Sequence, residues 1–443
     1  MLSYWRPKLA KGFDAVSTSF WFIPLICLSL AFVLLALTHW LDRLLPTQAD
    51  GLLSVLYEIE PEGARTVLAT IASAIITVTS IAFSMIVVTL TLASSQFGPR
   101  LLRTFMQNQK TKLSLGIFLA TFAYCLALIR FVNSGDQTPF VPGLGIGVAL
   151  MLAIISVFTL VFLIHHVATS IQADNVIEQC WHNLACDLHN MFPYLSQPTV
   201  QVSHDVDWAA CSHCQELRAE RDGYIQIIQI EALVSTLRQA DAGLELNVKP
   251  GAYVVKGELI GAVRSEVRCD IAHQLHRNIL IGRTRTPLQD PEFAIMQMVE
   301  LALRALSPGI NDPQTAITCL HRLGSAMSLL SHCEFPHTNV KDTDDVVRVQ
   351  RKVIDFEGIV RSACDQIRQA CVDHPCVIIA MLEVLTTVAR QCSNQQQKAI
   401  VFQQGEHLFQ HVQTKSMHVA DTNDIAQRYE ALCNAAQLLA AQE

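Results

Sequence analysis

The 34 residues at 66–99 carry no charged side chain, which is the strongest constraint that this sequence places on its fold. An uncharged apolar segment of about 20 residues or more is typical of a helix that crosses a membrane. Hydroxyl residues recur in this segment at alternating spacings of four and three, so they share one helical face with a single apolar member, Val87. This hydroxyl face consists of Thr66, Thr70, Ser73, Thr77, Ser80, Ser84, Thr91 and Ser94.

The hydroxyl face is expected to point at protein or at water, because lipid supplies no hydrogen-bonding partner. Two interpretations stay open: the small polar residues pack helices closely within one bundle, or they line a pore or a seam between subunits. As one continuous helix the segment would be about 51 Å long, against about 30 Å for the bilayer core. We therefore expect the helix to project beyond the bilayer until Gly98 and Pro99 end or bend it.

Four apolar segments are long enough to span a membrane, at residues 18–39, 66–92, 113–129 and 141–164. Basic residues are concentrated in the N-terminal tail and between the second and third segments, which predicts that both termini are cytosolic. No segment has a central Asp, Glu, Lys or Arg, the kind of group that ion-coupled and proton-coupled transporters need at mid-membrane. This pattern favours a passive pore over active transport.

Charge and cysteine content separate the two halves of the chain. The first 166 residues hold 10 Lys and Arg against 7 Asp and Glu, a net charge of +3, and the remainder carries −10. An acidic soluble half argues against nucleic acid as a partner. Twelve of the 14 cysteines lie after residue 166, in the half predicted to be cytosolic, so we expect reduced thiols and no disulfide framework.

The predicted fold is an α-helical membrane protein with four transmembrane helices, followed by a cytosolic α+β region. Its predicted parts are a transmembrane domain at 1–166, a helical extension or linker at 167–197, a small β-rich subdomain at 198–268 and a helical subdomain at 269–443. Pro250-Gly251 and Lys256-Gly257 are turn signals in the β-rich part. Three-to-four spacing of apolar residues predicts helices at 290–306, 312–331, 353–371, 376–390, 395–413 and 421–441, with a polar loop around Asp344.

The segment RALSPGINDPQTA at 304–316 is the sharpest local motif. Gly309 can adopt positive φ after a helix, Asp312 is a good N-cap, and Pro313 suits the first helical position. One interpretation is a rigid corner between two helices. The other is a site for a small anion or nucleotide at free helix-start amides, with a nearby arginine. The candidate residues are Arg285, Asp290, Arg304, Ser307, Asn311, Asp312 and Thr315.

Metal binding and catalysis have little support in the sequence. Cys211, His213 and Cys214 form a CxxC pair with metal-like spacing, but no second pair with standard spacing accompanies them. We therefore expect no metal or other cofactor. The sequence contains no nucleophile-elbow, phosphate-loop or zinc-protease motif, so an enzymatic activity has no positive evidence.

Two stretches resemble the bacterial membrane-protein family catalogued as domain of unknown function 2254. The first is SSQFGPRLLRTF at 94–105 with LGIFLATF at 115–122, and the second is RTRT at 283–286 with Asp290, Phe293 and the motif at 304–316. Gln314 departs from the Phe or Thr that we expect there. The resemblance implies a multi-pass protein of the bacterial inner membrane, and it supplies no reaction or substrate.

Two classes of function fit these observations. The first is a passive ion or small-solute channel, formed by a homo-oligomer in membrane lipid and carrying a cytosolic regulatory domain. The second is a membrane-anchored regulatory or scaffold module whose cytosolic half binds a small anion, a nucleotide or a protein. The hydroxyl face favours the first, and the motif at 304–316 favours the second.

Overall fold

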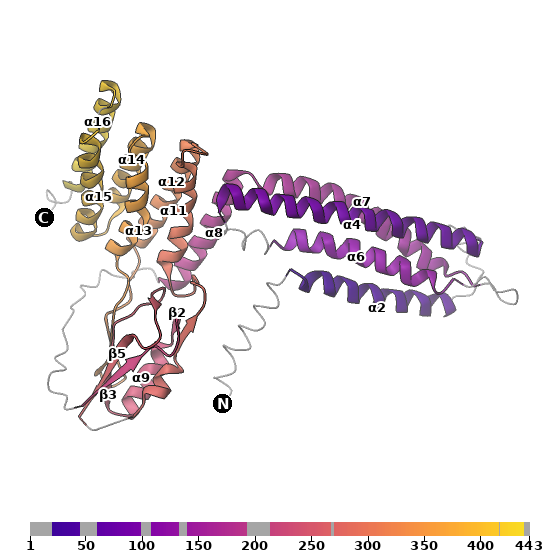
Figure 1. Cartoon of the computed structure of the whole chain (residues 1–443), viewed down its shortest axis with the longest axis horizontal. Helices are drawn as coiled ribbons and strands as arrows, with labels where there is room; N and C mark the ends of the chain where they lie inside the picture. The colour runs from indigo at the N-terminus through magenta and orange to yellow at the C-terminus, as the bar shows by residue number, and fades with distance from the viewer. Residues whose placement is uncertain are drawn as a thin grey trace. The chain divides into compact units, whose positions relative to one another are not determined.

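The computed structural model describes residues 20–44, 60–98, 108–132, 140–192, 213–266, 270–415 and 417–437. The chain divides into two compact units, Met1–Asn175 and Val176–Glu443, which we call the membrane unit and the C-terminal unit. Figure 1 shows long helices in the first unit, and two sheets with further helices in the second. The predicted fold class is therefore confirmed.

The membrane unit is built from four helices that are long and apolar enough to cross a bilayer. They are α2 (Phe22–Leu44), α4 (Pro61–Phe97), α6 (Gln109–Ile129) and α7 (Gly143–Ser170). Helix α6 packs against α2, α4 and α7, and α7 also contacts α2 and α4. Gly116 allows the close approach of α6 to α2, since a Cβ atom at this position would meet the Sγ atom of Cys27 at 2.7 Å.

Helix α4 is the longest element and confirms the predicted extension of the uncharged segment. Its 37 residues correspond to about 55 Å, well beyond a bilayer core of about 30 Å. It ends at Gly98, which adopts a φ of 96° and donates its N–H to the carbonyl of Ser94. Glycine is suited to this end because a side chain would be strained at that φ.

Asp42 joins two helices of the membrane unit. The prediction ended the first span at residue 39, but α2 continues to Leu44, so Asp42 lies in its last turn and is buried. Its carboxylate accepts the backbone N–H groups of Leu144 (2.9 Å) and Gly145 (3.1 Å) at the start of α7. A side chain from one helix thus caps the N-terminus of another.

Replacing Asp42 with alanine is expected to lower the free energy of unfolding of the membrane unit by about 2–3 kcal/mol, because two buried N–H groups lose their acceptor. Denaturation of the purified protein in mixed SDS micelles measures this difference. Ser29→Ala is the control, since the Ser29 hydroxyl is exposed on α2 and donates only to its own helix. Equal unfolding curves for the two variants would contradict the bridging role of Asp42.

The C-terminal unit begins with helix α8 (Ala173–Met191), most of which belongs to it. The sequence predicted a helical extension or linker at 167–197; in the structure α7 stops at Ser170 and α8 starts after Ile171 and Gln172. Helix α8 packs on the unit through an apolar stripe that includes Leu184 and Leu188. Glu178 in the same helix forms an ion pair with Arg322.

Two sheets form the β region. The strands are β1 (His213–Arg218), β2 (Gly223–Ile228), β3 (Ala242–Leu246), β4 (Tyr253–Val254), β5 (Leu259–Ser265), β6 (Ile279–Gly282), β7 (Asn339–Lys341) and β8 (Val347–Arg351). One sheet has the order β1-β5-β3-β8-β7 and the other β4-β2-β6. Helix α9 (Ile230–Gln239) and the short α10 (Ala272–His276) complete the region. Gly251 and Gly257 have positive φ at the two predicted turns, which are thereby confirmed.

Strands β6, β7 and β8 come from beyond residue 269, where the sequence predicted helices and one polar loop. Strands β7 and β8 lie between helices α12 and α13. They pair as an antiparallel hairpin, and β8 then joins β3 in parallel. Asp342 stabilises the turn by accepting N–H groups from Asp344 (2.9 Å) and Val346 (3.0 Å). The β region is therefore not one continuous stretch of sequence.

The six predicted helices of the C-terminal part are confirmed. They are α11 (Pro291–Ala305), α12 (Pro313–Leu330), α13 (Phe356–Ala370), α14 (Pro375–Gln391), α15 (Gln395–Gln413) and α16 (Val419–Gln437). Helices α11, α13 and α15 pack in one row and α12, α14 and α16 in a second, so consecutive pairs stack side by side (Figure 1). Acidic or amide N-caps start four of them, at Asp290, Asp312, Asp355 and Asn394.

Candidate functional site

The hydroxyl face lies away from the core of the membrane unit. Seven of its hydroxyl residues are exposed and Ser94 is half-buried. Packing against the other helices uses a different stripe of α4, which contains Ala64, Leu68, Ala72, Ile75, Ala82, Ile86 and Ala93. Within one subunit, then, the hydroxyl face does not serve as the packing surface between the described helices.

The hydroxyl donors of this face are already satisfied by α4 itself. Six of them donate to the carbonyl four residues earlier, at distances between 2.7 and 3.0 Å: Thr66, Thr70, Thr77, Ser80, Ser84 and Thr91. Such back-bonded hydroxyls can lie next to lipid or protein without a lost donor. These hydroxyl oxygens can still accept hydrogen bonds from water or a partner, and the small side chains allow a partner to approach closely.

The two stripes of α4 repeat along the sequence with different periods. The hydroxyl face runs from Thr66 to Ser94, 28 residues in eight steps, or 3.5 residues per step. With half-buried Thr79 and buried Thr89 included, the buried stripe runs from Ala64 to Ala93 in eight steps, about 3.6 residues per step, which is the period of a straight helix. A stripe with a period of 3.5 stays on one side only when a helix winds left-handedly around a partner. Because of this difference, the hydroxyl face lies opposite the buried stripe at Thr66 and beside it at Ser94.

The interior of the membrane unit is mostly apolar, and its buried polar side chains, such as Asp42, Thr121 and Tyr124, are hydrogen-bonded within the unit. Two clusters of buried side chains fill the space between the four helices. Thr121 on α6 bonds Ser156 on α7 (3.0 Å), and Tyr124 bonds both Thr38 (3.0 Å) and the carbonyl of Gly145 (3.2 Å). Between the described helices of one subunit these hydroxyl groups therefore bond to protein instead of lining a continuous polar path.

A lateral groove of about 390 Å³ lies between α2 and α4, with α6 as its floor. Its walls are aromatic and aliphatic, including Trp21, Phe83 and Leu119, and Ser80 and Ser84 also line it. These two members of the hydroxyl face thus have neighbours within their own subunit. The open part of the face is the portion nearer the start of α4, around Thr70, Ser73 and Thr77.

The motif at 304–316 forms the predicted corner between α11 and α12. Asp312 accepts the N–H (3.1 Å) and the hydroxyl (2.6 Å) of Thr315, and Pro313 occupies the first turn of α12. Ser307 donates its hydroxyl to the carbonyl of Arg304 (2.6 Å). The expectation for Gly309 was wrong: Asn311 takes the positive φ, at 50°, which asparagine tolerates better than most residues. The cap occupies an amide that the anion interpretation needed free.

Arg285 and Asp290 lie at the opposite end of α11 from this corner. Arg285 forms two hydrogen bonds with the Asp290 carboxylate, of 2.5 and 3.0 Å, and Asp290 caps α11 through the N–H of Phe293. The 15 residues of α11 extend about 22 Å, so Arg285 does not take part in the corner. The candidate residues predicted as one site therefore fall in two places.

The proposed metal ligands do not form a metal site among the described residues. Cys211 lies outside the described ranges, and His213 and Cys214 are consecutive, exposed residues of β1. Within the described part of the chain no three His, Cys, Asp or Glu side chains are grouped to hold a metal ion. Burial raises the pKa of the thiols of Cys180, Cys319, Cys364, Cys371 and Cys392 to about 12, so these remain protonated.

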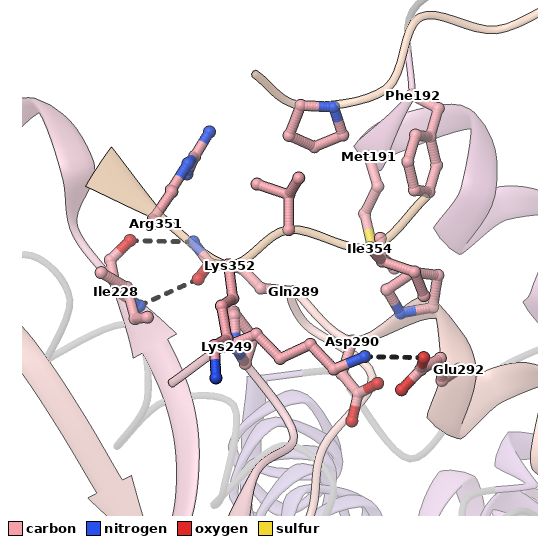
Figure 2. A pocket seen from close by; sticks show the side chains of 14 residues that line it. Met191, Phe192, Ile228, Lys249, Gln289, Asp290, Glu292, Arg351, Lys352 and Ile354 are labelled. Atoms are coloured by element: carbon pink, nitrogen blue, oxygen red, sulfur yellow. Dashed lines mark hydrogen bonds and ion pairs between the residues drawn. The ribbon is translucent and has the colours of Figure 1, made fainter. Parts of the chain in front are cut away.

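The structure also contains a cavity that the sequence did not reveal, shown in Figure 2. It has a volume of about 190 Å³, and the end of α8, the turn at Lys249, the start of α11 and the segment after β8 line it. Gln289 closes one side by bonding the backbone N–H (2.9 Å) and carbonyl (3.4 Å) of Ile228. Its lining residues are far apart in sequence, and the only local signal was the basic pair Arg351 and Lys352.

Comparison with known proteins places the chain in a family without assigning an activity. Two similar proteins are both described as uncharacterized: Rv1290c of Mycobacterium tuberculosis and Mb1321c of Mycobacterium bovis. Each is 29% identical to this chain over 366 residues, which cover 81% of this chain and 70% of the relative. No solved structure shows a significant match.

The family described as "Predicted membrane protein (DUF2254)" matches residues 17–387. This confirms the resemblance seen in the motifs at 94–122 and 283–316. The four candidate spans agree with that description. The chain is thus a multi-pass membrane protein that belongs to the DUF2254 family.

Proposed function

We propose that this protein is a passive channel for ions or small solutes, formed when copies of the chain associate around the hydroxyl faces of α4. The observation that carries the proposal is the exposure of this face, above all around Thr70, Ser73 and Thr77, where the described helices of its own bundle leave α4 uncovered. The apolar interior of a single membrane unit supports a path between subunits over one within a subunit. The period of 3.5 residues is the one that keeps a stripe on the axis of helices wound around each other.

The hydroxyl face is suited to a weakly selective pore. Its side chains offer oxygen acceptors to passing water or ions, and tight binding is not expected without charged ligands. From the distribution of basic residues we propose that both termini are in the cytosol of a bacterium and that the membrane is the inner one. The C-terminal unit would then be the cytosolic regulatory domain.

Thr77→Leu is expected to reduce solute flux through reconstituted protein by about tenfold or more, because a larger apolar side chain narrows and dehydrates the pore. Proteoliposomes loaded with a fluorescent ion indicator measure this flux. Thr159→Leu is the control, since Thr159 also donates to its own helix, by a 2.7 Å bond to Ile155, but is half-buried on α7. Wild-type vesicles without flux above empty liposomes would refute the channel.

A further inference from the structure

The cavity in the C-terminal unit combines an apolar wall with an excess of positive charge. Met191 and Phe192 from the end of α8 and Val353 and Ile354 from the segment after β8 supply much of the apolar wall. Lys249, Arg351 and Lys352 bring three cationic side chains from two separate segments. Clefts that combine apolar walls with a few placed polar groups are the usual form of small-molecule sites.

The two acidic residues of the cavity already have partners. Asp290 is held by Arg285, and Glu292 accepts a hydrogen bond from Lys249 at 2.8 Å. Figure 2 shows the Lys249–Glu292 pair on one side of the cavity, and the guanidinium of Arg351 well separated from that pair. Among the described residues no carboxylate lies within ion-pairing distance of Arg351 or Lys352. The unmatched charge of the cavity is therefore positive.

The backbone N–H and the Nε atom of Arg351 form hydrogen bonds, whereas its two terminal nitrogens form none with the described residues. Its Nε atom donates to the carbonyl of His337 (3.2 Å), and its backbone N–H donates to the carbonyl of Thr338 (2.9 Å). Neither terminal nitrogen has a hydrogen-bond acceptor among the described residues. Arg351 also lines a shallower hollow next to the cavity, formed with Phe335, Pro336 and Asn339. The two terminal nitrogens together can bind a carboxylate or phosphate by two parallel hydrogen bonds.

The pKa values of Arg285 and Arg351 shift in opposite directions because only Arg285 has a close carboxylate. Burial alone would lower the pKa of Arg285, but its hydrogen bond to Asp290 and the charge of that carboxylate raise the pKa instead. Burial lowers the pKa of Arg351, and the charge of Glu231 offsets this only in part. A partly buried cation without a close anion is unfavourable, and binding an anion would relieve it.

We propose that this cavity binds a small compound with an oxyanion group, a carboxylate or a phosphate, attached to an apolar body. Arg351 takes the oxyanion through its terminal nitrogens, Lys352 adds positive charge, and Met191, Phe192, Val353 and Ile354 contact the body. This site lies away from the corner at 304–316, and it does not depend on the proposed channel.

Isothermal titration calorimetry of the full chain in nanodiscs of neutral lipid tests the proposal. The probes are phenyl phosphate, benzoate, inorganic phosphate and benzylammonium, the last having a similar body with the opposite charge. We expect an aromatic anion to bind, and Arg351→Gln to weaken this binding by about tenfold or more, the effect of losing a charge-assisted hydrogen bond. Arg351→Lys keeps the charge without the planar fork and should give an intermediate loss. Arg361→Gln is the control, because Arg361 is exposed on α13.

Several results would overturn the proposal. They are the absence of saturable binding of either aromatic anion into the millimolar range, equal binding of benzylammonium, and unchanged affinity in a folded Arg351→Gln variant. Inorganic phosphate binding as tightly as phenyl phosphate would remove the role of the apolar wall. Repeating the titration in nanodiscs with phosphatidic acid identifies the source of the anion: competition supports a lipid headgroup, and its absence supports a free compound. Since binding is measured without flux, this test is separate from that of the channel.

Discussion

Replacing Asp290 with alanine is expected to lower the stability of the C-terminal unit by about 3–5 kcal/mol, the largest loss that we expect from any single substitution of a charged residue here. Asp290 is 2% exposed and performs two functions at once. It caps α11 through Phe293, and it neutralises the half-buried Arg285 by two hydrogen bonds. Its removal leaves a helix start uncapped and a cation without its partner. Hydrogen exchange of peptides from α11 and α12, measured on the full chain, reports this local stability.

Asp355→Ala separates the two contributions of Asp290. Asp355 caps α13 in the same way, by accepting the N–H of Gly358 at 2.8 Å, but it is exposed. Its loss should cost about 1 kcal/mol, the ordinary value for a cap. If the two variants lose similar protection, the pair between Arg285 and Asp290 contributes no more than an exposed cap, and our account of this region is wrong.

Gly251→Ala is expected to destabilise the C-terminal unit by about 3–5 kcal/mol through backbone strain and overpacking. Gly251 has a φ of 88°, and a Cβ atom on it would lie 2.1 Å from the Oδ2 atom of Asp290. The buried carboxylate cannot move aside without giving up Arg285. Chemical denaturation of the full chain, followed at peptides from β2 and α11 by hydrogen exchange, measures this loss. Gly257→Ala is the matched control, since Gly257 has a similar φ of 86° with open space around its Cα.

A double-mutant cycle tests whether the strain at Gly251 comes from Asp290. The cost of Gly251→Ala should fall in the Asp290→Ala background to about the value found for Gly257→Ala, because only the backbone strain then remains. If the losses of stability from the two substitutions are strictly additive, the close approach of Gly251 to Asp290 is not what makes Gly251→Ala destabilising.

Local signals account for what the sequence predicted correctly. The four spans follow from apolar runs, and α4 ends where Gly98 breaks it. The start of α12 follows from Asp312 and Pro313, which act on neighbours three residues away or fewer. Within the C-terminal unit the six helices match their apolar spacing because each buries one face against the next. In all these cases the signal that predicted the element lies within a single helix turn or a single repeat of the apolar pattern.

Features that depend on distant parts of the chain could not be predicted. The sequence grouped Arg285 with the corner as a nearby arginine for an anion, whereas its partner Asp290 holds it one helix length away. The parallel pairing of β8 with β3 joins residues about 100 apart, and no local pattern encodes it. Likewise, nothing in the motif at 304–316 indicated that Asn311, instead of Gly309, would adopt positive φ.

The hydroxyl face illustrates a premise that held only in part. The prediction assumed that each hydroxyl needs a partner outside its helix. Instead, backbone carbonyls of α4 accept hydrogen bonds from the hydroxyls of Thr70, Thr77 and Ser84. Their spacing still records a period different from that of the buried stripe. Whether water, lipid or another subunit covers this face therefore decides the function, and a measurement in the membrane distinguishes these environments.

Site-specific modification of cysteines on α4 is the most direct test of the channel. Single variants Ser73→Cys, Thr77→Cys and Ser80→Cys in proteoliposomes are treated with a charged, water-soluble methanethiosulfonate, and mass spectrometry quantifies modification at each site. Our account predicts fast modification on the hydroxyl face and little at Val157→Cys, because Val157 is also exposed in a single subunit but lies on α7. Modification at Ser73, Thr77 and Ser80 as slow as at Val157 would place the hydroxyl face in lipid or in a dry interface, and would contradict the channel.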